Sequence, residues 1–97
     1  MNNITRSETL QRTKNMLKRE WNLSVEPTSD ISLCNLPPGG LGKTEYTVRA
    51  LERPIETLDF ADVNAQLSGH NLADADSVGT LSDRIWAAIP DAHKANV

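Results

Sequence analysis

Two apolar stripes at helical spacing, one near each end of the chain, most constrain what this sequence can fold into. The first predicts a helix over 5–21 and the second a helix over 77–89. Thr5 opens a capping box at the start of the first helix, and Pro90 stops the second one. The stripe residues are Leu10, Met16, Leu17, Trp21, Val78, Leu81, Ile85 and Ile89.

The middle of the chain carries two weaker helical patterns. A second helix is predicted from Leu41 to Arg53, because Leu41, Val48 and Leu51 fall near one face. Pro54 is expected to end this helix, since the residue before a proline is pushed out of the helical region. A short third helix is predicted over 59–68, with Asp59 as its cap and Gly69 after its end.

Three other segments are predicted to be irregular. Residues 22–40 form a long first loop, 70–76 a polar loop, and 91–97 a frayed tail. A loop as long as the first is uncommon unless it packs on the core. The apolar residues available to hold it there are Leu23, Val25, Ile31, Leu33 and Leu36.

These patterns predict an all-α fold, because no pair of strand patterns and no hairpin signal accompanies the helices. The expected architecture is a small antiparallel four-helix bundle, with three main helices, one short helix and a long first loop. A length of 97 residues suits one domain, so residues 1–97 are treated as a single helical unit.

Charge and cysteine usage narrow the class of protein. Residues 1–21 hold five Lys/Arg and two Asp/Glu, whereas residues 22–97 hold five Lys/Arg and eleven Asp/Glu. The acidic larger part argues against nucleic acid as a partner, and the short basic part is interpreted as a solvated helix face. Cys34 is the single cysteine, so no internal disulfide forms. No signal-peptide pattern or membrane span is visible, and the expectation is a soluble cytoplasmic protein.

Few residues offer catalytic or metal chemistry. Gly42-Lys43-Thr44 ends like a phosphate-binding loop, but Pro37 stands where that motif needs its first glycine. The two histidines, His70 and His93, have no neighbour at a metal-ligand spacing, so no metal is expected.

The remaining candidates also favour structural roles. Cys34 is interpreted as a small buried thiol rather than a nucleophile. Asp74 and Asp76 suit loop and cap positions, and Met16 and Trp21 suit the core rather than a ligand pocket. The sequence therefore does not predict an enzyme.

The order of features resembles the acyl carrier protein family, including the peptidyl carrier domains. The likeness covers most of 5–89 and begins with the first helix ending in Trp21-Asn22-Leu23. PTSDISLCNL (27–36) is similar to the family's first loop, VRALE (48–52) to its second helix, and DSVGTLSDRI (76–85) to the opening of its last helix. The resemblance implies an acyl-carrier-like bundle.

The family carries 4′-phosphopantetheine on a serine in an Asp-Ser-Leu corner at the start of its second helix. In the favoured alignment the corner here reads Gly39-Gly40-Leu41, so Gly40 replaces the serine and offers no hydroxyl. No prosthetic group is expected in that case. In a second alignment Glu56-Thr57-Leu58 matches the corner and Thr57 is the displaced attachment site.

The resemblance implies a non-catalytic carrier-like binding module that acts through protein–protein contacts in lipid, fatty acid, polyketide or peptide biosynthesis. Two alternatives stay open: a functional acyl or peptidyl carrier with a displaced attachment site, and a small regulatory or scaffold bundle unrelated to acyl transfer. A protein partner is expected on the corner and the second helix. The candidate partner-binding residues are Leu41, Lys43, Glu45, Tyr46, Arg49 and Arg53.

Overall fold

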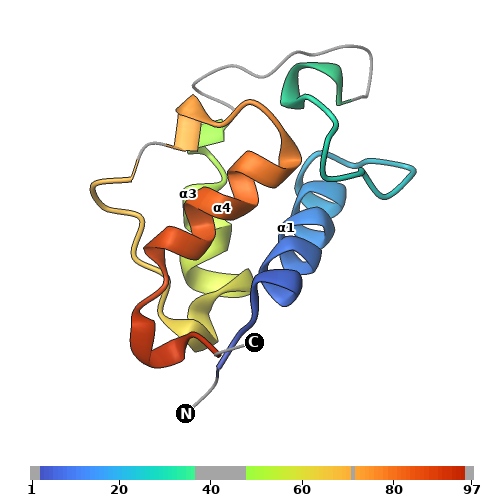
Figure 1. Cartoon of the computed structure of the whole chain (residues 1–97). Coiled ribbons are helices and arrows are strands. Elements are labelled where there is room, and N and C mark those ends of the chain that lie inside the picture. The colour runs from blue at the N-terminus through green and yellow to red at the C-terminus, as the bar shows by residue number, and fades with distance from the viewer. Residues whose placement is uncertain (1–2, 37–47, 71, 96–97) are drawn as a thin grey trace.

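The computed structural model describes residues 3–36, 48–70 and 72–95, and within these ranges the chain is helical with no β-strand (Figure 1). The prediction of an all-α fold is therefore confirmed. The elements in chain order are α1 (Arg6–Glu20), the 3-10 turn η1 (Leu33–Asn35), α3 (Glu52–Pro54), the π-helical turn η2 (Ile55–Asp59), the 3-10 turns η3 (Ala61–Val63) and η4 (Leu72–Asp74), α4 (Val78–Ala88) and the 3-10 turn η5 (Asp91–His93).

The two end helices pack against each other and run in opposite directions (Figure 1). The start of α1 lies beside the second half of α4, because Arg6 contacts both Asp83 and Trp86. Helix α1 begins where predicted, with the Thr5 hydroxyl accepting from the Glu8 amide at 3.1 Å. Helix α4 begins after Ser77, which forms a complete capping box with Thr80. Both predicted terminal helices are confirmed.

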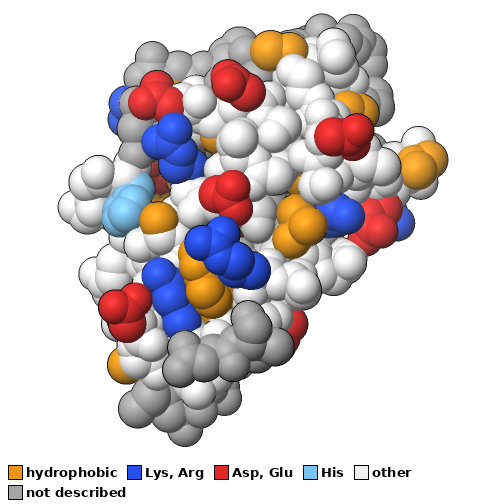
Figure 2. All heavy atoms as spheres, in the orientation of Figure 1, with side chains coloured by type: hydrophobic (Ala, Val, Ile, Leu, Met, Phe, Trp, Pro, Cys, Tyr) orange, Lys and Arg blue, Asp and Glu red, His pale blue; other side chains and the backbone are white. Residues whose placement is uncertain are grey.

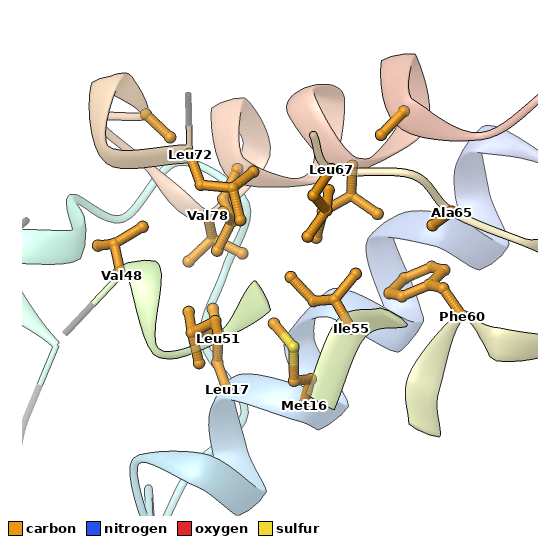
Figure 3. Packing of buried hydrophobic residues seen from close by; sticks show 14 of the residues in the cluster. Met16, Leu17, Val48, Leu51, Ile55, Phe60, Ala65, Leu67, Leu72 and Val78 are labelled. Atoms are coloured by element: carbon orange, nitrogen blue, oxygen red, sulfur yellow. The ribbon is translucent and has the colours of Figure 1, made fainter. Parts of the chain in front are cut away.

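The core lies where α1, α4 and the middle segment meet, and Figure 3 shows apolar side chains from all three pointing toward one another. Met16 and Leu17 of α1 face Leu51 and Ile55, and Phe60 closes one side. The apolar residues predicted for the stripe of α4 are all buried. Burial of this apolar surface is the dominant favourable term in the folding of a domain this small.

The long first loop packs along the start of α4, which explains how it is held. Ser29 and Ile31 accept hydrogen bonds from the Gly79 and Val78 amides at 2.8 and 3.1 Å, and the Leu33 amide donates to the Asp76 carbonyl at 2.9 Å. Leu23, Leu33 and Leu36 are buried, as expected, and Ile31 packs partly against the core. The prediction was wrong for Val25, which is 74% exposed.

The end of the second predicted helix is wrong, because Pro54 lies inside a helical run. Proline needs no amide hydrogen in the first turn of a helix, and Pro54 falls in the first turn of α3. The run continues through η2, whose last hydrogen bond joins the Phe60 amide to the Ile55 carbonyl at 2.9 Å. The part of this predicted helix over 41–47 lies outside the described residues.

The predicted third helix over 59–68 is wrong. Asp59 ends η2 instead of capping a helix, and η3 is stopped by Asn64, whose φ of 55° is left-handed. Asparagine tolerates this region better than most residues, so it makes a natural break. Leu67 is buried as expected, but from a non-helical segment, and the loop expected over 70–76 contains η4. The described residues therefore do not confirm the predicted four-helix bundle.

Residues 91–95 are paired with the N-terminal segment, although fraying was expected from 91 to 97. The Ile4 amide donates to the His93 carbonyl at 2.8 Å, and the Ala95 amide donates to the Ile4 carbonyl at 2.9 Å. Ile4 is fully buried, so its side chain helps to anchor this parallel bridge. This pairing could not be predicted from the sequence, because an isolated bridge between two residues has no alternating strand pattern. Residues 96–97 lie outside the described part.

No helix within the described residues is long and apolar enough to cross a membrane.

Candidate functional site

The predicted site falls partly outside the described residues. Arg49, Arg53 and Thr57 are described, and all three are exposed. The remaining predicted site residues lie outside the described ranges, namely Gly40, Leu41, Lys43, Glu45 and Tyr46. The structure therefore defines the second half of the candidate surface, from Val48 to Asp59.

Burial alternates around this helical run as expected of a surface helix. Val48, Leu51 and Ile55 are buried against the core, whereas Arg49 and Arg53 face outward. The predicted apolar face is thereby confirmed for its described members. The two arginines share the exposed side, so they lie where a partner could reach them.

The π-helical turn η2 turns one more apolar side chain outward. Leu58 follows Val48, Leu51 and Ile55 at a spacing that would bury it in a continuous α-helix. The wider π turn, closed by an i to i+5 hydrogen bond, shifts the helical phase. Leu58 is consequently 66% exposed.

Thr57 lies beside Leu58, and its hydroxyl is already engaged. Thr57 Oγ1 donates to the Arg53 carbonyl at 2.6 Å, which ties the side chain to its own helix. The residue lies inside the helical run rather than at its start. The helical elements between this position and α4, within the described part, are the short 3-10 turns η3 and η4.

Two arginines of α1 hold η2 in place. Arg19 makes a two-pronged contact with the Asp59 carboxylate, at 2.7 and 2.9 Å, and Asp59 is only 12% exposed. Arg12 donates to the Asp59 carbonyl at 2.9 Å and pairs with Asp62 at 2.7 Å. Two parallel N–H···O bonds fix geometry as well as charge.

The electrostatics of this contact agree with its geometry. The hydrogen bond to Asp59, followed by the one to Glu20, raises the pKa of Arg19. The hydrogen bond to Asp62 raises the pKa of Arg12, and burial opposes that rise. Arg12 also lies over the Phe60 ring, 5.8 Å from its centroid. The turn that carries Leu58 is therefore fixed from the α1 side.

The start of α4 offers no amide for an anion. Its first two amides, those of Val78 and Gly79, donate to the first loop, and the Thr80 amide donates to the Ser77 hydroxyl at 3.2 Å. A helix start binds phosphate through amides that have no other acceptor. This helix N-terminus is therefore saturated by the protein itself.

The other chemistry-bearing residues are dispersed. Cys34 is exposed, so its interpretation as a buried thiol is wrong; it is the middle residue of η1, whose buried position is taken by Leu33. His70 and His93 are half-buried in different turns. Within the described ranges, no group of three His, Cys, Asp or Glu side chains lies close enough to hold a metal ion.

Sequence reasoning missed Leu58 and the two arginines of α1 that support it. No local signal marks Arg12 and Arg19, because their partners lie far away along the chain. Leu58 could have been noticed as an apolar residue next to the Asp59-Phe60 break. Comparisons of the chain with protein-family models, curated proteins and solved structures found no match.

Proposed function

We propose that this chain is a non-catalytic binding module of the carrier-protein type that works without a prosthetic group. Its task is to contact another protein in lipid, fatty acid, polyketide or peptide biosynthesis. The surface is the helical run that ends in η2, with Arg49, Arg53 and Leu58 as its described contact residues. The order of a long first helix, a long packed loop, a central helical run and a capped last helix supports this proposal.

The observation that carries the proposal is a leucine that is both exposed and fixed. Leu58 is 66% exposed, while the next residue, Asp59, is bonded through its carboxylate to Arg19 and through its carbonyl to Arg12. A contact residue on a preorganised turn loses little conformational entropy on binding. Apolar anchors of this kind supply most of the affinity of protein interfaces.

The absence of catalysis is inferred from how the buried polar groups are used. Thr9 and Thr13 are fully buried in α1, and their hydroxyls donate to the carbonyls one turn earlier at 2.9 and 2.7 Å. Such bonds serve the helix rather than a substrate. The carboxylates of Asp59 and Asp62 are likewise paired with arginines of α1, Arg19 and Arg12.

A crosslinking experiment tests the partner surface. A photoreactive amino acid is placed at position 58 in one variant and at position 25 in another, since Val25 is equally apolar and exposed but lies in the first loop. In the lysate of the source organism, we expect a defined adduct from position 58, and its loss when Arg53 is changed to Glu. Equal adducts from both positions would contradict the proposal.

A mass spectrum tests the claim about the prosthetic group. The chain is co-expressed with a broad-specificity phosphopantetheinyl transferase, beside an authentic carrier protein as the positive control. We expect the intact mass of this chain to stay unchanged. The intact mass of the control should rise by that of the 4′-phosphopantetheine group. Attachment of the arm to any residue would overturn this part of the proposal.

The displaced carrier site is kept as the second candidate because Thr57 is exposed. Its hydroxyl would have to leave the Arg53 carbonyl before it could accept a phosphoryl group. The same mass spectrum on Thr57→Ala decides the matter. A mass gain that disappears in Thr57→Ala would establish this alternative, and a gain that persists would exclude it.

A further inference from the structure

A groove between α1 and α4 lies away from the surface discussed above. It has a volume of about 230 Å³ and is open to solvent on one side. Arg6, Ser7 and Leu10 line it from α1, and Gly79, Ser82 and Asp83 line it from α4. Pockets for drug-sized ligands begin at about 300 Å³, so this groove suits a smaller molecule.

Ser82 is the feature of the groove that points to a ligand. The residue is only 5% exposed, and its hydroxyl has no hydrogen-bond partner among the described residues. The buried Thr9 and Thr13 behave differently, since both bond to a carbonyl of their own helix. No fully inaccessible side-chain nitrogen or oxygen of the described residues lacks a partner, so the Ser82 hydroxyl is reached from the groove. A hydroxyl that water can reach through the groove can also bond to a ligand group that takes the place of that water.

The charges of the groove are balanced. Arg6 and Asp83 lie 3.5 Å apart, and each side chain is 69% exposed, so the pair is weak and can open. The Arg6 guanidinium also lies 5.4 Å from the centroid of the Trp86 ring, which keeps it at the groove. Figure 2 shows the same balance more widely, because basic, acidic and hydrophobic side chains are interspersed on this face.

A ligand of either single charge would meet a like charge in this groove. A molecule that carries both charges could open the weak Arg6–Asp83 ion pair. Its anionic group would then contact Arg6, and its cationic group would contact Asp83. The half-buried Leu10 provides an apolar wall on the α1 side of the groove, and Gly79 lines the α4 side. The ligand that best fits these features is a small zwitterion with an apolar part.

We propose that the α1–α4 groove binds a small α-amino acid with an apolar side chain. Its carboxylate is held by the Arg6 guanidinium and the hydroxyls of Ser7 and Ser82, its ammonium by Asp83, and its side chain by Leu10. This site does not depend on the partner surface around Leu58, so either proposal can fail alone.

An NMR titration of the ¹⁵N-labelled chain tests the ligand class with leucine as the probe. We expect amide shifts at residues 6–10 and 79–83, with a Kd in the roughly millimolar range for so few ligand atoms. Leucinamide lacks the carboxylate and N-acetylleucine lacks the ammonium, so each should bind at least about tenfold more weakly. Equal shifts from both derivatives, or from sodium acetate alone, would mean that only adventitious ions bind, and would overturn the proposal.

Variants test the roles of the residues. Ser82→Ala should weaken leucine binding about three- to tenfold, and Arg6→Gln and Asp83→Asn about tenfold each. Ser24→Ala, in the exposed first loop, is the matched control and should change nothing. The Tm of Ser82→Ala should stay level, because the hydroxyl bonds to no described protein group, so lost binding cannot be ascribed to unfolding. Unchanged binding by Ser82→Ala, or no shift of the groove amides with leucine, would contradict the site.

Discussion

The two ends of this chain and its middle reach the same core by different means. α1 and α4 are continuous helices. Each is capped by the residue directly before its first turn, Thr5 for α1 and Ser77 for α4. The middle, from Leu51 to Leu72, is a succession of a short helix, a π turn and 3-10 turns. Both regions bury most of their apolar side chains, with Leu58 of the middle as the exposed exception, so regular structure is not what decides burial here.

The difference lies in where each region finds its polar partners. The end helices satisfy most of their backbone groups locally, through their own hydrogen bonds and caps. The middle depends on groups from distant parts of the chain, above all Arg12 and Arg19. Local sequence is therefore informative for the ends and incomplete for the middle.

The largest effect is expected from Phe60→Ala. Phe60 is fully buried at the irregular join between η2 and η3, and removal of its ring should lower the free energy of unfolding by about 3–5 kcal/mol. Chemical denaturation followed by circular dichroism measures this. Ile85→Ala in α4 is the comparison and should cost about 2–5 kcal/mol. A loss below about 1 kcal/mol for Phe60→Ala would show that the middle is a loosely attached segment.

Gly79→Ala reverses the usual preference for alanine in helices. An alanine Cβ there would lie 3.0 Å from the Ser29 carbonyl oxygen, which also accepts from the Gly79 amide. We expect a loss of about 1–2 kcal/mol in the free energy of unfolding, because the first loop must move. Ala87→Gly, on the exposed side of the same helix, should also lower the free energy of unfolding by about 1 kcal/mol, because glycine has a lower helix propensity than alanine. A more stable Gly79→Ala variant would mean that the loop is not held against α4.

Ser77→Ala tests the cap that makes α4 predictable. The Ser77 hydroxyl accepts from the Thr80 amide at 3.2 Å, and the Thr80 hydroxyl accepts from the Ser77 amide at 2.7 Å. Loss of this cap should cost about 1 kcal/mol, measured by urea denaturation. Thr5→Ala, at the more exposed start of α1, should cost the same or less. Neutral results for both would show that tertiary packing alone fixes the ends.

A double-mutant cycle measures how strongly α1 holds the π turn. The free energy of unfolding is measured for Arg19→Gln, for Asp59→Asn and for the double variant. The coupling energy between the two side chains should be about 0.5–1 kcal/mol, because Arg19 is half exposed. The coupling should fall when the salt concentration is raised. Arg6→Gln with Asp83→Asn is the control cycle, since that pair is exposed on both sides. Equal coupling in the two cycles would remove the special role of Arg19.

The smallest effect concerns Asp30 in the first loop. A hydrogen bond from the Thr28 hydroxyl, at 2.7 Å, lowers the pKa of Asp30 below its ordinary value. Because the folded pKa is depressed, the stabilising contribution is present above the unfolded pKa and is lost as the pH falls through the folded pKa. Thr28→Ala should return the pKa toward the ordinary value in an NMR titration of the carboxyl group. No change in that titration would contradict the hydrogen bond.

The predicted parts of the fold were those with signals inside one stretch of chain. The stripe of α4, its cap and Pro90 together fixed both ends of that helix. Phe60 and Val63 have helical spacing and are indeed buried, but Asn64 adopts a left-handed conformation that periodicity cannot reveal. Pro54 misled the prediction because its effect depends on whether it lies in the first turn or the interior of a helix.

The candidate site was predictable to a smaller extent. The outward position of Arg53 followed from the stripe that contains Leu51, so it needed no structure. Leu58 could not be placed in the same way, because its exposure depends on a π turn that Arg12 and Arg19 support from another helix. The unpaired hydroxyl of Ser82 also required the structure, since an ordinary helical serine would bond to its own helix.

The bridge between Ile4 and Lys94 has a mechanical consequence. The two segments run parallel, and their hydrogen bonds join Ile4 to His93 and to Ala95. A force that pulls the two segments in opposite directions along their common axis therefore loads both hydrogen bonds in shear at the same time. An antiparallel pair pulled from its open end would instead separate one bond after another. The bridge should thus resist stretching of the chain more strongly than its small size suggests.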